Sequence, residues 1–161
     1  MNILVRVNIL GTAAFVVSAT VAAVVFTPVF RTIGVVVALV LFAIGVASFI
    51  LGYFTAVQRS RYDNISVASL FLLIGTVSSF KVRRLMNGCL LVQGLCGLIT
   101  ALARTTTDGR SGSTLAFGVL VPLFGLGLNG LWSSRHGQFS PLDVSKTITP
   151  NPKIGKDGVH G

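Results

Sequence analysis

The sequence predicts an all-α membrane protein with four transmembrane helices and a short re-entrant or interfacial segment between the second and third spans. Three observations favour this fold class. Of the 161 residues, 52% are hydrophobic and only 11% are charged, whereas a soluble domain carries about 25% charged residues. Four apolar stretches are long enough to cross a bilayer, which takes about 20 helical residues. A fifth stretch between them is shorter and more polar.

The first span is expected at residues 4–26. Its apolar run is longer than the hydrophobic region of a secretory signal, which holds about 7–15 residues, so we interpret it as a retained helix. Small residues fall on one face of this helix, among them Gly11 and Ser18. Small side chains let a neighbouring helix backbone approach closely.

The second span is expected at residues 33–57. Pro28 interrupts the apolar run before it and predicts a tight hairpin with the charge of Arg31 at its tip. Along the span, small residues recur at every seventh position, namely Ala38, Gly45 and Gly52. This spacing indicates a second face for close helix packing.

Residues 65–80 decide the topology of the chain. This stretch is too short for an ordinary span and contains several serine and threonine residues, which favours a re-entrant or interfacial segment. Basic residues flank it on both sides: Arg59, Arg61, Lys81, Arg83 and Arg84. Such juxtamembrane cations set topology and attract anionic lipid headgroups.

The distribution of basic residues favours four spans with both termini in the cytoplasm. That model leaves only Arg31, Arg104 and Arg110 outside, and the positive-inside rule prefers basic residues within. Five spans with a cytoplasmic N-terminus would reverse this balance. Five spans with an external N-terminus would again place most basic residues inside, so that model stays as the alternative. The domain boundaries follow as a transmembrane domain at residues 1–134 and an extended cytoplasmic tail at 135–161.

The third span is expected at residues 85–103, with Gln93 near its middle. A buried amide in a membrane needs a hydrogen-bonding partner inside the bundle or on a partner protein. Gly97 adds another small packing position. Cys89 and Cys96 lie about 10 Å apart along a helix, too far for a disulfide.

The fourth span is expected at residues 114–132, with a kink at Pro122. The face that carries this proline also holds Gly118, Gly125 and Asn129. Asn87 matches Asn129 in depth, which predicts contact between these two side chains. Trp132 is expected to anchor the helix at the membrane interface.

The sequence contains no pattern that specifies a reaction. Glutamate is absent, no aspartate lies in an expected span, and the two histidines are isolated. No nucleotide-binding loop, hydrolase motif or metal-binding cluster is present. We therefore expect no enzyme activity, no catalytic or metal-binding residues and no cofactor. The scattered basic clusters also do not form one nucleic-acid-binding patch.

Three blocks of sequence carry a resemblance to a known family. They are AVQRSRYDNISVASLFLLIG (56–75), KVRRLMNGCLLVQGL (81–95) and LAFGVLVPLFGLGLNGLWSSRHGQF (115–139). Together they resemble a family of small four-span actinobacterial membrane proteins that includes an accessory subunit of mycobacterial Mce lipid importers. The resemblance implies a role in binding or stabilising the permease of an ABC-type importer, and it brings no catalytic residues with it.

The expected function is therefore that of a non-enzymatic accessory subunit in a larger membrane transport complex, preferably an Mce-type ABC lipid importer. The expected partners are integral membrane subunits and anionic lipid headgroups of the plasma membrane, without nucleic acid. Two alternatives remain open. One is an accessory subunit of a respiratory supercomplex, and the other is a small oligomeric channel or carrier, whose polar lumen only a few residues such as Gln93 could line.

Overall fold

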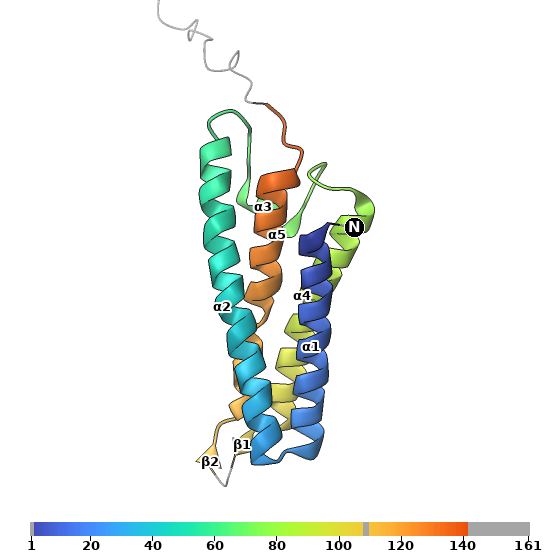
Figure 1. Cartoon of the computed structure of the whole chain (residues 1–161), viewed down its shortest axis with the longest axis vertical. Coiled ribbons are helices and arrows are strands. Elements are labelled where there is room, and N and C mark those ends of the chain that lie inside the picture. The colour runs from blue at the N-terminus through green and yellow to red at the C-terminus, as the bar shows by residue number, and fades with distance from the viewer. Residues whose placement is uncertain (1, 108–109, 142–161) are drawn as a thin grey trace, which may run out of the picture.

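Four long helical spans run side by side in the computed structural model, which describes residues 2–107 and 110–141 (Figure 1). The long elements are α1 (Ile3–Val25), α2 (Pro28–Arg59), α4 (Phe80–Ala103) and a broken fourth span formed by the 3₁₀ helix η1 (Thr114–Leu120) and α5 (Pro122–His136). The minor elements are α3 (Val67–Leu72) and the two strands of a small hairpin, β1 (Thr106–Thr107) and β2 (Arg110–Ser111). All four spans are long and apolar enough to cross a membrane, which confirms the expected fold class.

The segment between α2 and α4 enters and leaves at one end of the bundle (Figure 1). Its only helix, α3, has six residues, so the segment re-enters the bundle and does not cross it. Asn2 lies at the same end, where its side-chain Nδ2 is 3.0 Å from Nε2 of His136. Both ends of the described chain therefore lie on one side, as the four-span prediction requires.

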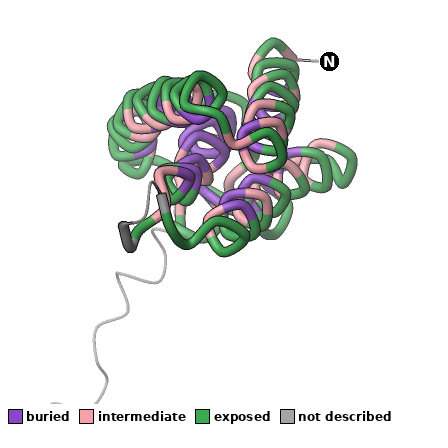
Figure 2. The backbone as a smooth tube through the Cα atoms, turned by 90° about the horizontal axis from the view of Figure 1, so that it is seen from below, coloured by how far each residue is buried: buried purple, intermediate pink, exposed green. Residues whose placement is uncertain are grey.

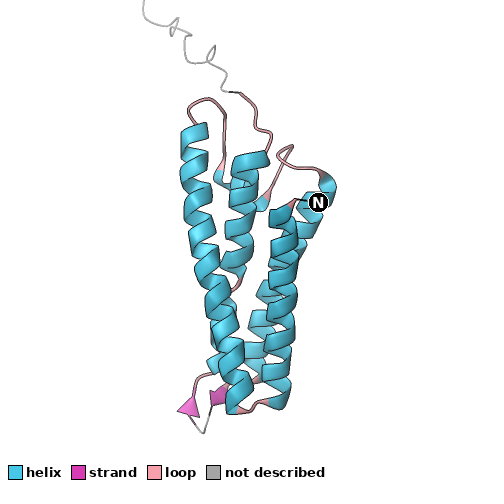
Figure 3. Cartoon of the chain, in the orientation of Figure 1, coloured by secondary structure: helices cyan, strands magenta, loops and turns pink. Residues whose placement is uncertain are grey.

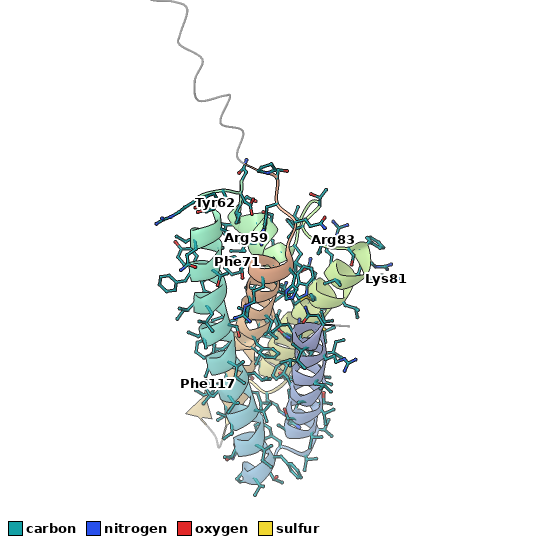
Figure 4. The ribbon with its side chains drawn as sticks, turned by 45° about the horizontal axis from the view of Figure 1, so that its top comes forward. Arg59, Tyr62, Phe71, Lys81, Arg83 and Phe117 are labelled. Carbon is teal, nitrogen blue, oxygen red and sulfur yellow. The ribbon has the colours of Figure 1, made fainter. Side chains whose placement is uncertain are left out.

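We call this side the basic end, because seven cationic residues of the described chain gather there. They are Arg6, Arg59, Arg61, Lys81, Arg83, Arg84 and Arg135. Figure 4 labels Arg59, Lys81 and Arg83 at this end, with Phe117 farther down the bundle. The opposite side carries the α1–α2 turn and the β-hairpin, and we call it the hairpin end.

Two helices begin earlier than the sequence indicated. The second span begins at Pro28 and not near residue 33, because proline at the first helical position loses no hydrogen bond and already has a helical φ. Arg31 therefore belongs to the helix, where it is only 9% exposed and its guanidinium lies 5.0 Å from the ring centre of Phe26. Likewise α4 begins at Phe80, so Lys81 lies in its first turn.

The small residues predicted for packing lie where helix backbones approach one another. A Cβ atom on Gly45 would lie 2.5 Å from the backbone nitrogen of Phe124, and one on Gly52 would lie 2.7 Å from that of Leu131. Ala38, on the same face of α2, is 1% exposed. The face of α2 on which small residues recur at every seventh position therefore packs against α5 of the same chain.

The other small residues are distributed over the remaining helix contacts. A Cβ on Gly97 would lie 2.5 Å from the carbonyl oxygen of Gly118, where α4 meets η1. Gly11 faces the ring of Phe124, Gly125 faces Gln93, and Ser18 is half-buried in α1. Figure 2 shows buried residues on the inner faces of the helices and exposed residues around the outside.

The fourth span is broken near its middle (Figure 3). The 3₁₀ helix ends at Leu120, and Pro122 occupies the first position of α5. The predicted kink is thus a change of helix type. Residues after His136 pack back on the re-entrant segment, since Gln138 N–H donates to Val77 and Asn64 N–H donates to Ser140. The tail expected from residue 135 begins later, because Arg135 and His136 belong to α5, and its part from residue 142 onward lies outside the described residues.

Candidate functional site

The side chain of Gln93 lies at the centre of a polar network inside the bundle. Its Nε2 donates to Oδ1 of Asn8 at 3.2 Å and to Oγ1 of Thr12 at 2.7 Å. Its Oε1 accepts from the backbone N–H of Gly125 at 3.2 Å. One amide therefore connects α1, α4 and α5, and it is 0% exposed.

The break at Pro122 explains why a backbone donor is available to Gln93. The first turn of a helix has N–H groups without partners in the helix itself, and Gly125 lies in the first turn of α5. In hydrocarbon such a donor needs a partner from the protein. Gln93 supplies that partner, so the helix break and the buried amide form one structural unit.

A second polar cluster holds the re-entrant helix α3. Three consecutive carbonyl oxygens at its C-terminal end accept hydrogen bonds from side chains of later helices. Ser133 donates to Leu70 at 2.5 Å, Asn129 donates to Phe71 at 3.0 Å, and Asn87 donates to Leu72 at 2.7 Å. Asn129 also donates to Oδ1 of Asn87 at 3.0 Å, the contact that matching depth predicted.

Arg59 joins the end of α2 to the end of α5. Its guanidinium forms an ion pair with Asp63 at 2.8 Å and donates to the carbonyl oxygens of Ser134 at 3.0 Å and Gly137 at 3.3 Å. It also lies 5.2 Å from the ring centre of Phe139. The sequence indicated that Arg59 contacts lipid headgroups, but its guanidinium is bonded within the chain.

The other flanking cations are placed differently. Arg61, Lys81 and Arg84 are exposed, and Arg83 is half-buried and donates to the carbonyl oxygen of Gly75 at 3.3 Å. The guanidinium groups of Arg83 and Arg84 lie 5.6 and 5.1 Å from the ring centre of Phe80.

A polar pocket of about 400 Å³ opens at the basic end, between the loop before α4 and the end of α5. We call it the polar cup. Its polar lining residues are Thr76, Ser78, Ser79, Trp132, His136 and Gln138. Trp132 is 8% exposed and its ring centre lies 5.7 Å from that of His136, so it does not serve as the interface anchor that the sequence indicated.

A second pocket, of about 360 Å³, is an apolar groove between α2 and the re-entrant segment. Phe49, Tyr53 and Val57 line it from α2, and Ile65 and Leu70 line it from the opposite side. Its surface is almost entirely apolar, so it is suited to contact with lipid chains or apolar side chains.

Comparison with known proteins adds no relative. No family model, curated protein sequence or solved structure matches the chain.

The structure brings the two predicted intramembrane amides into separate clusters. Gln93 bonds within the network of α1, α4 and α5, whereas Asn129 bonds to α3 and α4. Sequence reasoning did not select Asn8, Thr12 or Ser133. The signal that would have found them is a polar residue four positions from another within an apolar span, as in Asn8 with Thr12 and Asn129 with Ser133.

The described residues contain no group of three or more potential metal ligands. Cys89 and Cys96 are both free, as their spacing predicted. What the arrangement does provide is tight internal packing, a re-entrant segment fixed by side chains, and a cationic surface at one end.

Proposed function

We propose that this chain is a non-enzymatic accessory subunit that binds and stabilises or regulates a larger membrane transport complex, with an Mce-type ABC lipid importer as the preferred assembly. One observation carries the proposal. The buried amides of the spans, Gln93 and Asn129, form hydrogen bonds within the chain itself. Groups engaged in this way support packing and do not line a path for a solute.

The same observation weighs against a carrier built from a single copy. A polar lumen would need Gln93, Thr100 or Asn129 on its wall. Gln93 and Asn129 are 0% exposed, and the hydroxyl of Thr100 donates to the carbonyl oxygen of Cys96 at 2.8 Å. The outward faces of the helices, in contrast, carry large apolar side chains that suit lipid or another membrane subunit.

The orientation proposed for the protein follows from charge. Basic residues favour the cytoplasmic side of a membrane, and the basic end holds most of those near the spans. We therefore place this end and both termini in the cytoplasm, in the plasma membrane. A cytoplasmic surface of this kind suits an importer that carries an ATPase on that side.

The packing of α2 limits which of its faces a partner subunit can contact. Gly45 and Gly52 are in contact with α5, so the small-residue face of α2 serves the fold of this chain. Partner subunits would then contact the outer faces of the spans and the exposed cations of the basic end, such as Arg61 and Lys81.

The deciding experiment is purification of the tagged protein from its native membrane in mild detergent, with mass spectrometry of the proteins that accompany it. An unrelated four-span protein, tagged and expressed at the same level, is the control. Stoichiometric recovery of importer permease and ATPase subunits would support the proposal. Recovery of oxidase or cytochrome subunits would favour the respiratory alternative, and recovery of the chain alone as a defined oligomer would refute an accessory role.

A further inference from the structure

Two polar groups in residues that line the polar cup have no hydrogen-bonding partner among the described residues. They are the indole Nε1 of Trp132 and the hydroxyl of Ser78, and both atoms are buried without a partner in residues 2–107 and 110–141. The indole N–H can only donate. A buried donor without a partner is costly, so these two groups indicate a ligand with acceptor atoms.

The first turn of α4 adds backbone donors at the rim of the cup. Ser79, which lines the cup, is the N-cap residue of this 24-residue helix, and its side chain does not cap the helix. Ser79 therefore provides no side-chain acceptor for the N–H groups that follow it. The N-terminus of a long helix carries a partial positive charge, and anions bind there readily.

The charges around the cup are cationic. Arg83 donates to the carbonyl oxygen of Gly75, the residue before Thr76 of the cup lining, and Lys81 lies in the first turn of α4. Among the described residues Asp63 is the only carboxylate, and it is paired with Arg59 at 2.8 Å. No negative charge in the described chain thus competes for these cations.

His136 forms one wall of the cup and already has partners for both ring nitrogens. Its Nδ1 lies 3.3 Å from the carbonyl oxygen of Trp132, and its Nε2 lies 3.0 Å from Nδ2 of Asn2. With Nδ1 protonated, the ring donates to the carbonyl and accepts from the asparagine. The imidazole therefore helps to fix the wall of the cup. The donors without a partner are those of Trp132 and Ser78.

We propose that the polar cup binds a phosphate group. Several donors, a helix N-terminus and a neighbouring guanidinium fit an anion with multiple acceptor oxygens. The phosphate could belong to an anionic phospholipid headgroup, because the cup lies at the end of the membrane spans, or to free inorganic phosphate. This site does not depend on the accessory role proposed above.

The chain offers a direct readout, because Trp132 is its only tryptophan. The full-length protein is purified in dodecyl maltoside, which contains no phosphate, and its tryptophan emission is followed during titration. One titration uses inorganic phosphate. A second uses short-chain phosphatidylglycerol, and diacylglycerol of the same chain length serves as its phosphate-free control.

Two variants and one matched control test the location. Ser78→Ala removes a hydroxyl that has no partner in the part of the chain that the structure describes, so the fold should persist while phosphate binding weakens. Arg83→Gln and Arg61→Gln each remove one positive charge, but of the two only Arg83 is bonded to the loop that leads into the cup, at Gly75. We expect Ser78→Ala and Arg83→Gln to weaken binding about tenfold, as for loss of one hydrogen bond to a charged group. Circular dichroism and gel filtration verify the fold of each variant.

The outcomes separate the sources of phosphate. A saturable response to both ligands, or to inorganic phosphate alone, would support a site for free phosphate. A response to phosphatidylglycerol but not to phosphate or diacylglycerol would support a headgroup site. The absence of any saturable response would overturn the proposal, and so would equal weakening by Arg61→Gln and Arg83→Gln, because that result would indicate only general electrostatic attraction.

Discussion

The amide of Gln93 shows how much of this bundle depends on single polar groups. It joins three helices through Asn8, Thr12 and Gly125, at a depth where water does not replace a lost hydrogen bond. Hydrogen bonds between membrane helices contribute about 0.6 kcal/mol on average. A side chain that satisfies several groups at once should contribute more than that mean.

Replacement of this amide gives the first prediction. Gln93→Met keeps the length of the side chain but leaves the N–H of Gly125 without an acceptor. We expect the free energy of unfolding to fall by about 1–3 kcal/mol, measured by reversible unfolding in mixed micelles. The control is Leu91→Met, because Leu91 is 62% exposed on the same helix. Equal effects of the two substitutions would contradict the role assigned to Gln93.

Two glycines provide a matched test of close packing. A Cβ on Gly45 would lie 2.5 Å from a backbone atom of α5, whereas one on Gly88 would meet nothing within 4 Å. Gly45→Ala should therefore lower the midpoint temperature of unfolding. Gly88→Ala should leave it unchanged or raise it, because alanine favours a helix by about 1 kcal/mol over glycine. A neutral result for Gly45→Ala would show that the two helices can separate without cost.

At the scale of elements, the re-entrant helix α3 depends on helices that follow it. Six residues are too few for a helix to be stable alone. Its terminal carbonyl groups are satisfied by Asn87, Asn129 and Ser133. The apolar run of residues 65–80 therefore lies in the bundle as a short helix with a return loop, fixed by donors from outside itself.

Adjacent serines of α5 test this dependence. Ser133 donates to the carbonyl oxygen of Leu70 in α3, whereas Ser134 donates to Leu131 within its own helix. Ser133→Ala should increase hydrogen exchange of the α3 amides about tenfold, the effect of losing about 1.4 kcal/mol. Ser134 is as deeply buried as Ser133, but Ser134→Ala should leave that exchange unchanged. Identical exchange in both variants would mean that other contacts hold α3.

At the scale of the whole molecule, the position of the return loop fixes the side of every later segment. With Cys89 and Cys96 first replaced by alanine, single cysteines at Tyr62 and Lys81 should react alike with a membrane-impermeant maleimide. A cysteine at Ser113 should show the opposite accessibility. Five spans would instead place Tyr62 and Lys81 on different sides, so different labelling at these two positions would refute the four-span topology.

The four spans and several contacts between them could be predicted from the sequence for physical reasons. Hydrophobic length identifies spans, and matched depth identified the contact of Asn87 with Asn129. The prediction placed the start of α2 too late because Pro28 was interpreted as an interruption, although proline suits a first helical turn. It assigned Arg59 to lipid because no pattern reveals that the carbonyl groups of Ser134 and Gly137 lie nearby.

The polar cup could not be predicted from the sequence for a similar reason. Its walls come from residues 76–79 and from the end of α5, more than fifty positions apart. Ser78 and Ser79 look like ordinary loop residues, and Trp132 looks like an interface anchor. Only the return of the chain after α3 brings them together around one space.

The origin of the three side chains that hold α3 has a consequence for biosynthesis. Asn87, Asn129 and Ser133 all emerge from the ribosome after α3 itself. While the nascent chain is being inserted, the carbonyl groups of Leu70, Phe71 and Leu72 have no intramolecular partners, and lipid offers none. The segment must therefore remain near water or within the insertion machinery until α4 and α5 arrive. Its entry into the bundle is a late event of maturation, and a chain arrested before residue 129 would be a natural substrate for quality-control proteolysis.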